Sequence, residues 1–220
     1  MRRLVLIAAV LVCSATWANG QAGVELVGPT QQIPRGTFKT WSLFLICNPD
    51  WATPDKSKDL AALYNRFRPF HEAIGADNLG VWFWKRPMAI NDPNLGANVD
   101  IARSAAFCAA IGKPPSQGPY LVVTSEYPDV ANFPRDRAIF ELGGLPPADL
   151  ANLLNKLTDQ LLLQNRVDAA LTTANPPREP SSLWIRLLEG ARQTLIGFGC
   201  AVKLQIQTGP LTAELRGCAG

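Results

Sequence analysis

Histidine and closely spaced cysteines are scarce in this chain of 220 residues, and their scarcity limits the chemistry that it can perform. The sequence contains one histidine, His71, and five cysteines, none of which belongs to a Cys-x-x-Cys pair. Structural zinc sites need several Cys or His ligands at short spacings, so no metal site is predicted. A glycine-rich loop followed by Lys-Ser/Thr, which binds nucleotide phosphates, is also missing. We therefore expect no cofactor.

Runs of basic residues are missing as well. The formal net charge is +3, and Arg2 and Arg3 at the start of the chain account for two of these charges. The rest of the chain is nearly neutral, so it has no positively charged surface of the kind that binds a polyanion. The sequence therefore predicts no nucleic-acid partner.

A targeting segment is predicted at residues 1–22. Arg2 and Arg3 precede an apolar run, residues 4–12, that is too short to span a bilayer comfortably. Small residues at 16 and 18 and at 20 and 22 offer two cleavage motifs. We interpret the segment as a cleaved secretory signal, which places the chain in the periplasm or outside the cell. The alternative is an uncleaved N-terminal anchor, and membrane contact is expected only through such an anchor or through a partner.

A buried strand followed by an amphipathic helix is predicted after a leader at residues 23–40. Residues 41–47 are almost continuously apolar, which is typical of a strand buried on both faces. Thr53 and Pro54 predict a helix that begins at about Pro54, because Thr is a good N-cap and Pro suits the first helical position. Pro69 is expected to kink or shorten this helix. The apolar face consists of Leu60, Leu63, Tyr64, Phe67, His71 and Ile74.

Further elements alternate along the chain. Strands are predicted at 79–85, 120–124 and 138–142, and helices at about 93–111 and from 146 onward. Within the leader, residues 24–27 form either a short edge strand or part of an irregular segment. Residues 166–180 are predicted to be a linker because they are rich in Asn and Pro.

A helix and a β-hairpin are predicted as an extension at residues 181–220. Strands 202–206 and 211–215 alternate apolar and polar residues. Their apolar pattern predicts a register that pairs Ile206 with Leu211 and Val202 with Leu215.

From Trp41 to about Gln164, the order of elements resembles the thioredoxin fold. Residues 51–56, Trp-Ala-Thr-Pro-Asp-Lys, lie where thioredoxins carry Trp-Cys-Gly-Pro-Cys-Lys. Gly118-Pro119 lies where that family has a cis-proline before its third strand. The resemblance implies a thioredoxin-like three-layer α/β sandwich at residues 41–165, followed by the helix and hairpin extension.

Two departures from the thioredoxin pattern bear on function. Ala52 and Asp55 occupy the two cysteine positions, and disulfide exchange needs a thiolate at the helix N-terminus with a second thiol in reach. The resemblance therefore implies a redox-inactive member. The loop at residues 126–137 is also longer than is usual in the family.

The resemblance implies a binding groove where the first helix meets the proline loop. An extended peptide can pair there with the backbone, a use that needs no thiol. The candidate groove residues are Trp51, Ala52, Thr53, Pro54, Asp55, Gly118 and Pro119. The expected function is an exported, redox-inactive module that binds a polypeptide or supports an assembly of the cell envelope, with a protein or peptide partner there.

The alternative function is a non-redox enzyme with an acidic site at the N-terminus of the first helix. Asp50, Asp55 and Glu126 are the candidate carboxylates. A deep pocket with a raised carboxyl pKa would favour the enzyme.

Four cysteines follow the targeting segment, and an even number in an exported chain suggests disulfides. Cys200 and Cys218 flank the hairpin and are the candidate pair. The predicted register sets Cys200 opposite Gly217, so this bridge needs a bulge or a frayed end. For Cys47 and Cys108 we favour buried, unpaired thiols; the alternatives are a bridge between helix and sheet, or a thiol enzyme. His71 is expected to be packed or solvent-facing rather than catalytic.

Overall fold

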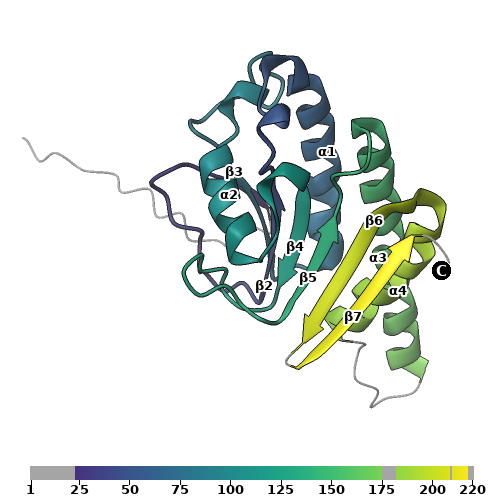
Figure 1. Ribbon diagram of the computed structural model, residues 1–220. Coiled ribbons are helices and arrows are strands. Elements are labelled where there is room, and N and C mark those ends of the chain that lie inside the picture. The colour runs from purple at the N-terminus through teal and green to yellow at the C-terminus, as the bar shows by residue number, and fades with distance from the viewer. Residues whose placement is uncertain (1–22, 175–181, 209, 218–220) are drawn as a thin grey trace, which may run out of the picture.

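A single sheet organises the part of the chain described by the computed structural model, residues 23–174, 182–208 and 210–217 (Figure 1). The sheet has seven strands, and helices cover both of its faces, which confirms the predicted α/β class. The expected signal at residues 1–22 lies outside the described residues. No helix within them combines the length and the apolar composition that crossing a membrane requires.

The strands lie in the order β1–β3–β2–β4–β5–β6–β7. β1, β3 and β2 run parallel to one another, and every pairing from β2–β4 to β6–β7 is antiparallel. Their bounds are β1 Val24–Val27, β2 Thr40–Leu45, β3 Asn78–Phe83, β4 Tyr120–Thr124, β5 Arg137–Glu141, β6 Gly199–Thr208 and β7 Leu211–Gly217. The leader therefore contributes an edge strand, and the C-terminal hairpin continues the same sheet.

Helix α2 lies on one face of the sheet, and α1, α3 and α4 lie on the other (Figure 1). The bounds are α1 Ser57–Ile74, α2 Ile101–Ala110, α3 Pro147–Ala174 and α4 Leu183–Leu195. Short 3-10 helices are η1 Pro49–Trp51, η2 Pro54–Lys56, η3 Gly96–Asn98, η4 Pro115–Gln117 and η5 Ile196–Phe198.

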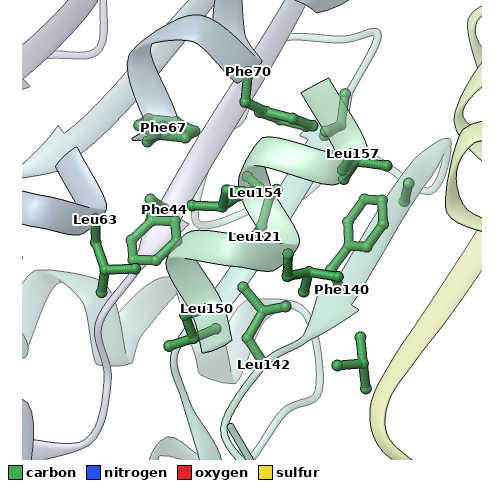
Figure 2. Packing of buried hydrophobic residues seen from close by; sticks show 14 of the residues in the cluster. Phe44, Leu63, Phe67, Phe70, Leu121, Phe140, Leu142, Leu150, Leu154 and Leu157 are labelled. Carbon is green, nitrogen blue, oxygen red and sulfur yellow. The ribbon is translucent and has the colours of Figure 1, made fainter. Parts of the chain in front are cut away.

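The larger core fills the space between the sheet and the three helices on one face. Figure 2 shows side chains of α1, α3 and the central strands pointing toward one another. The labelled members are Phe44, Leu63, Phe67, Phe70, Leu121, Phe140, Leu142, Leu150, Leu154 and Leu157. All are buried. This packing fixes the axis of α1, and with it the position of the N-terminus of α1 at the edge of the sheet.

The predicted start of the first helix agrees with the structure. Thr53 has an extended backbone and precedes η2, with Pro54 at the first helical position, and α1 follows directly from Ser57. Pro69 does not shorten the helix, because α1 continues through Pro69 to Ile74, and the alternative, a kink at Pro69, stays a prediction.

The second helix begins later than predicted, at Ile101 instead of about residue 93. Asp100 is its N-cap, and the carboxylate of Asp100 accepts a hydrogen bond of 3.0 Å from the backbone N–H of Arg103. Residues 93–100 form the turn η3 and irregular backbone instead. The cap that forms, at Asp100, marks the start of the helix, although Asp92 and Asn94 are equally good capping residues by type.

The third helix is longer than predicted and occupies the first part of the expected linker at residues 166–180. α3 continues to Ala174, while residues 175–181 lie outside the described part. Asn165 gives the physical reason: its side chain donates to the carbonyl of Ala73 on α1 at 3.0 Å and accepts from Arg186 on α4. Contacts with two neighbouring helices thus hold α3 at residue 165, directly before the expected linker, and the helix continues from this anchored point.

The predicted register of the hairpin is wrong by two residues on one strand. Leu211 pairs with Thr208 instead of Ile206, and Leu215 pairs with Leu204 instead of Val202. Both registers put the apolar residues on one face, so the alternation alone does not distinguish them. A register shift lies between Gly199 and Lys203, where a bulge was expected.

Candidate functional site

The loop after β2 and the loop before β4 meet at one edge of the sheet. Leu45 at the end of β2 pairs with Tyr120 at the start of β4. A Cβ atom on Gly118 would lie 3.4 Å from the backbone nitrogen of Cys47. The side chain of Asn48 donates to the carbonyl of Ser116 at 3.3 Å and joins the two loops.

The peptide bond between Gly118 and Pro119 is cis, as the sequence predicted. Both residues are buried. Across the candidate groove, Pro54 and Asp55 are exposed, while Trp51, Ala52 and Thr53 are half-buried. The exposed part of the candidate site is therefore the first turn of η2, and the proline loop supports it from within.

An unexpected segment packs against the N-terminus of α1. A Cβ atom on Gly96, in η3, would lie only 1.9 Å from the carbonyl oxygen of Thr53, so the two backbones are in direct contact. The backbone N–H of Gly96 also donates to the hydroxyl of the buried Ser57 at 2.9 Å. The connection between β3 and α2 thus packs against Thr53 and the first turn of α1. Only a glycine allows two backbones to approach this closely. Gly96 falls within the helix predicted at about residues 93–111, where glycine is unfavourable, and this was the one feature of the sequence that could have indicated the contact.

The carboxylates proposed for an enzyme do not form a common site. Asp50 and Asp55 follow the end of β2, whereas Glu126 follows Thr124, which pairs with Trp41 near the beginning of β2. Glu126 is therefore at the opposite end of the sheet. The hydroxyl of Thr53 donates to Asp55 and holds the pKa of that carboxyl below its usual range. A lowered pKa is the reverse of what a general acid at this place requires.

Cys47 and Cys108 form a disulfide bond, so the prediction of two unpaired thiols is wrong. Their Cα atoms are 6.6 Å apart, and the bond ties α2 to the segment that follows β2. Both residues are buried, so neither is an accessible nucleophile. Cys200 is also disulfide-bonded. Cys218 lies outside the described residues, so the pairing of Cys200 with Cys218 stays a prediction.

His71 is a buried structural residue. The side-chain amide of Asn78 donates to Nδ1 of His71 at 2.7 Å. The amide oxygen of Asn78 accepts from the hydroxyls of Thr40 at 2.9 Å and Ser42 at 3.0 Å. Its NH₂ group also donates at 3.2 Å to the backbone carbonyl of His71, which can only accept, and this fixes the orientation of the amide. Burial lowers the pKa of His71 to about 4, and nearby Arg68 adds to this effect. The network joins α1 to β2 and β3 and faces the core, away from the candidate groove.

A cavity of about 760 Å³ lies beside α2, and sequence reasoning missed it. The segment after β1 forms one wall, and Arg103 holds this segment through the carbonyls of Gly28 and Gln31. Tyr127 closes another side, with its hydroxyl on the carbonyl of Ile33 at 3.0 Å. The cavity joins segments far apart in the chain, and no local pattern in the sequence marks it.

Comparisons of the chain with family models, with curated proteins and with solved structures found no match. Within the described ranges, no cluster of three or more His, Cys, Asp or Glu side chains is arranged to hold a metal ion. The candidate site therefore rests on the geometry at the N-terminus of α1, where residues 51–55 lie beside the Gly118–Pro119 loop.

Proposed function

We propose that this chain is an exported, redox-inactive, thioredoxin-like module. It binds an extended polypeptide at the N-terminus of α1 and so supports an assembly of the cell envelope. The observation that carries the proposal is the cis Gly118–Pro119 loop at the same sheet edge as the first turn before α1.

The topology supports the thioredoxin-like part of the proposal. Strands β3, β2, β4 and β5 are adjacent, with β3 and β2 parallel and the other pairings antiparallel. α1 and α3 cover one face of these strands, and α2 covers the other. This arrangement matches the element order on which the resemblance rests. β1 and the hairpin β6–β7 then extend the sheet at its two edges.

The residues directly before the N-terminus of α1 support a binding role without redox chemistry. Ala52 and Asp55 carry no thiol, and the nearest cysteine in sequence, Cys47, is buried in a disulfide. An extended segment there would meet the exposed residues Pro54 and Asp55 and the half-buried side chain of Trp51, while the buried proline loop holds this surface from beneath.

A binding experiment with a permanently unfolded probe tests the proposal. Carboxymethylated, reduced lactalbumin offers extended backbone without free thiols, and its binding can be followed by fluorescence anisotropy. Ala52→Glu should weaken binding by about tenfold or more, because the larger charged side chain fills the groove. Ala62→Glu is the matched control, since Ala62 is exposed on α1, outside the candidate groove residues. Equal binding by both variants, each folded by circular dichroism, would place the interaction elsewhere.

An activity assay tests the redox-inactive part. The purified protein should neither reduce insulin nor oxidise a dithiol peptide, since the helix mouth holds no thiol. Measurable exchange that is lost when Cys47 and Cys108 are both replaced by Ser would show that the chain has redox function.

Export and the second disulfide are tested on protein from the cell envelope. Mass spectrometry should find a chain that begins near Asn19 or Gly23; full-length protein confined to the cytosol would contradict export. Non-reducing peptide mapping should find the peptides of Cys200 and Cys218 linked. Free alkylation of Cys218 in the native protein would exclude that pair.

A further inference from the structure

The outer three strands expose a polar face on the α2 side of the sheet. Figure 1 shows β6 and β7 in front of α3 and α4, while α2 lies over the neighbouring strands. Ala138 and Phe140 of β5 point into the core beneath α3, so Arg137 and Glu141 point to the opposite side. The pairing register places Arg137, Gln207 and Thr212 side by side in one row across β5, β6 and β7.

A cavity of about 280 Å³ opens over this row. Its polar lining consists of Lys113, Arg137, Gln205, Gln207 and Thr212, and its apolar lining consists of Ile111 and Ile139. The lining includes two cations, two amides and a hydroxyl, but no carboxylate. The volume is smaller than the range of about 300–1,000 Å³ that is usual for drug-sized ligands.

The guanidinium of Arg137 is only partly satisfied. Nη1 donates to the carbonyl of Pro134 at 2.9 Å, and the guanidinium lies 5.7 Å from the centre of the ring of Phe133. Nε is buried and has no hydrogen-bond partner in the structure. No described carboxylate forms an ion pair with it, and burial lowers the pKa of Arg137. A half-buried, unpaired cation is unfavourable unless something compensates its charge.

The second cation of the cavity is anchored by the protein itself. Lys113 pairs with Glu141, and its ammonium donates to Oε1 of Gln205 at 2.8 Å. This contact orients the side-chain amide of Gln205. Its oxygen faces Lys113, and its NH₂ group lies 3.5 Å from the carboxylate of Glu214. Lys113 is therefore largely compensated, and Arg137 is the cation that lacks a counter-charge.

We propose that this cavity is a binding site for a small oxyanion, a carboxylate or phosphate group, held by the guanidinium of Arg137. Arginine donates to such groups through two parallel hydrogen bonds, and Gln207 and Thr212 add neutral donors from the adjacent strands. The C-terminal end of α2 lies beside the cavity, and its dipole is equivalent to about half a negative charge. It therefore repels an anion less strongly than the full positive charge of Arg137 attracts one.

This site is separate from the candidate groove. Arg137 pairs with Thr124, which pairs with Trp41 near the start of β2, whereas the groove lies beyond the end of β2. The inference therefore does not depend on the proposed function.

Titration calorimetry on the full chain, with inorganic phosphate and with acetate as probes in chloride of matched ionic strength, tests the site. We expect saturable one-site binding of phosphate, of acetate, or of both. A response to phosphate alone assigns the site to a phosphate-bearing ligand, and a response to acetate assigns it to a carboxylate-bearing one. Binding of neither probe would overturn the proposal.

Two variants place the anion in the cavity. Arg137→Gln should weaken binding by about tenfold or more, because it removes the charge-assisted hydrogen bonds. Gln207→Glu puts a carboxylate beside Arg137, so it should abolish anion binding and raise the melting temperature measured without anion. Gln193→Glu, at an exposed position on α4, makes the same charge change on the other face.

The proposal predicts that Gln193→Glu binds the anion as the unchanged protein does. If Gln193→Glu and Gln207→Glu weaken binding equally, the anion interacts with overall charge and the site does not exist. Gln207→Glu retains the full test if Arg137→Gln fails to fold.

Discussion

His71 should remain neutral in the folded protein down to about pH 4, and the protein should lose stability as the pH falls toward that value. The imidazole is fully buried. Its Nδ1 accepts a hydrogen bond from the amide of Asn78, so the proton of the neutral ring is on Nε2. A second proton on Nδ1 would face the N–H of Asn78, and this amide does not turn over, because its NH₂ group also donates to the backbone carbonyl of His71, which can only accept.

The sign of the pH effect follows from the lowered pKa. Below the ordinary histidine pKa of 6.5, the unfolded chain binds a proton that the folded chain does not bind until about pH 4. The stabilisation due to neutral His71 is therefore present above pH 6.5 and is lost as the pH falls between these two values. The loss amounts to about 1.4 kcal/mol at about pH 5.5 and to about 3 kcal/mol when it is complete.

His71→Asn is the variant that isolates this effect. The side-chain oxygen of Asn can take the place of Nδ1 as acceptor for Asn78, but it does not titrate. The variant should be less stable near pH 7, because it leaves a small cavity. Between about pH 7.5 and pH 5.5, however, the unchanged protein should lose about 1.4 kcal/mol more than His71→Asn, since titration of the carboxylates is common to both.

Urea unfolding followed by tryptophan fluorescence measures these free energies, and NMR measures the pKa directly. The chain contains a single histidine, so its imidazole resonances need no assignment. A titration midpoint near 6.5 in the folded protein would refute the reasoning. Parallel pH profiles for the two proteins would refute it independently.

Two other perturbations test the surroundings of the candidate groove. Replacing both Cys47 and Cys108 by Ser should lower the free energy of unfolding by about 4 kcal/mol, because the bridge spans 61 residues of sequence; unchanged urea midpoints would show that the bond contributes little. Gly96→Ala should cost about 1–3 kcal/mol and disturb the helix mouth, because its Cβ would meet the carbonyl of Thr53. Urea unfolding measures this loss, and Gly197→Ala, whose Cβ would meet no atom closer than 3.7 Å, should be nearly neutral in the same assay.

The sequence by itself determined most of the elements and the fold class. The apolar run ending at Cys47 indicated the end of β2 to within two residues, and the Thr53-Pro54 pair indicated the start of η2, because burial on both faces and the fixed φ of proline are local properties. Alternation placed both strands of the hairpin and the face that each buries. The candidate groove came from the resemblance to the thioredoxin pattern, and the long-range pairing of β2 with β4 brings its two loops together.

The tertiary structure decided which of several locally equivalent arrangements forms. A slip of two residues preserves the apolar face of a hairpin, so pairing of β6 with β5 and packing against α4 had to select the register. The partner of Cys47 depended on where α2 packs, and composition does not encode that position. The length of α3 depended on contacts of Asn165 with α1 and α4. Contacts between segments distant in the chain made each of these choices, and their energies outweigh the local preferences from which a sequence is interpreted.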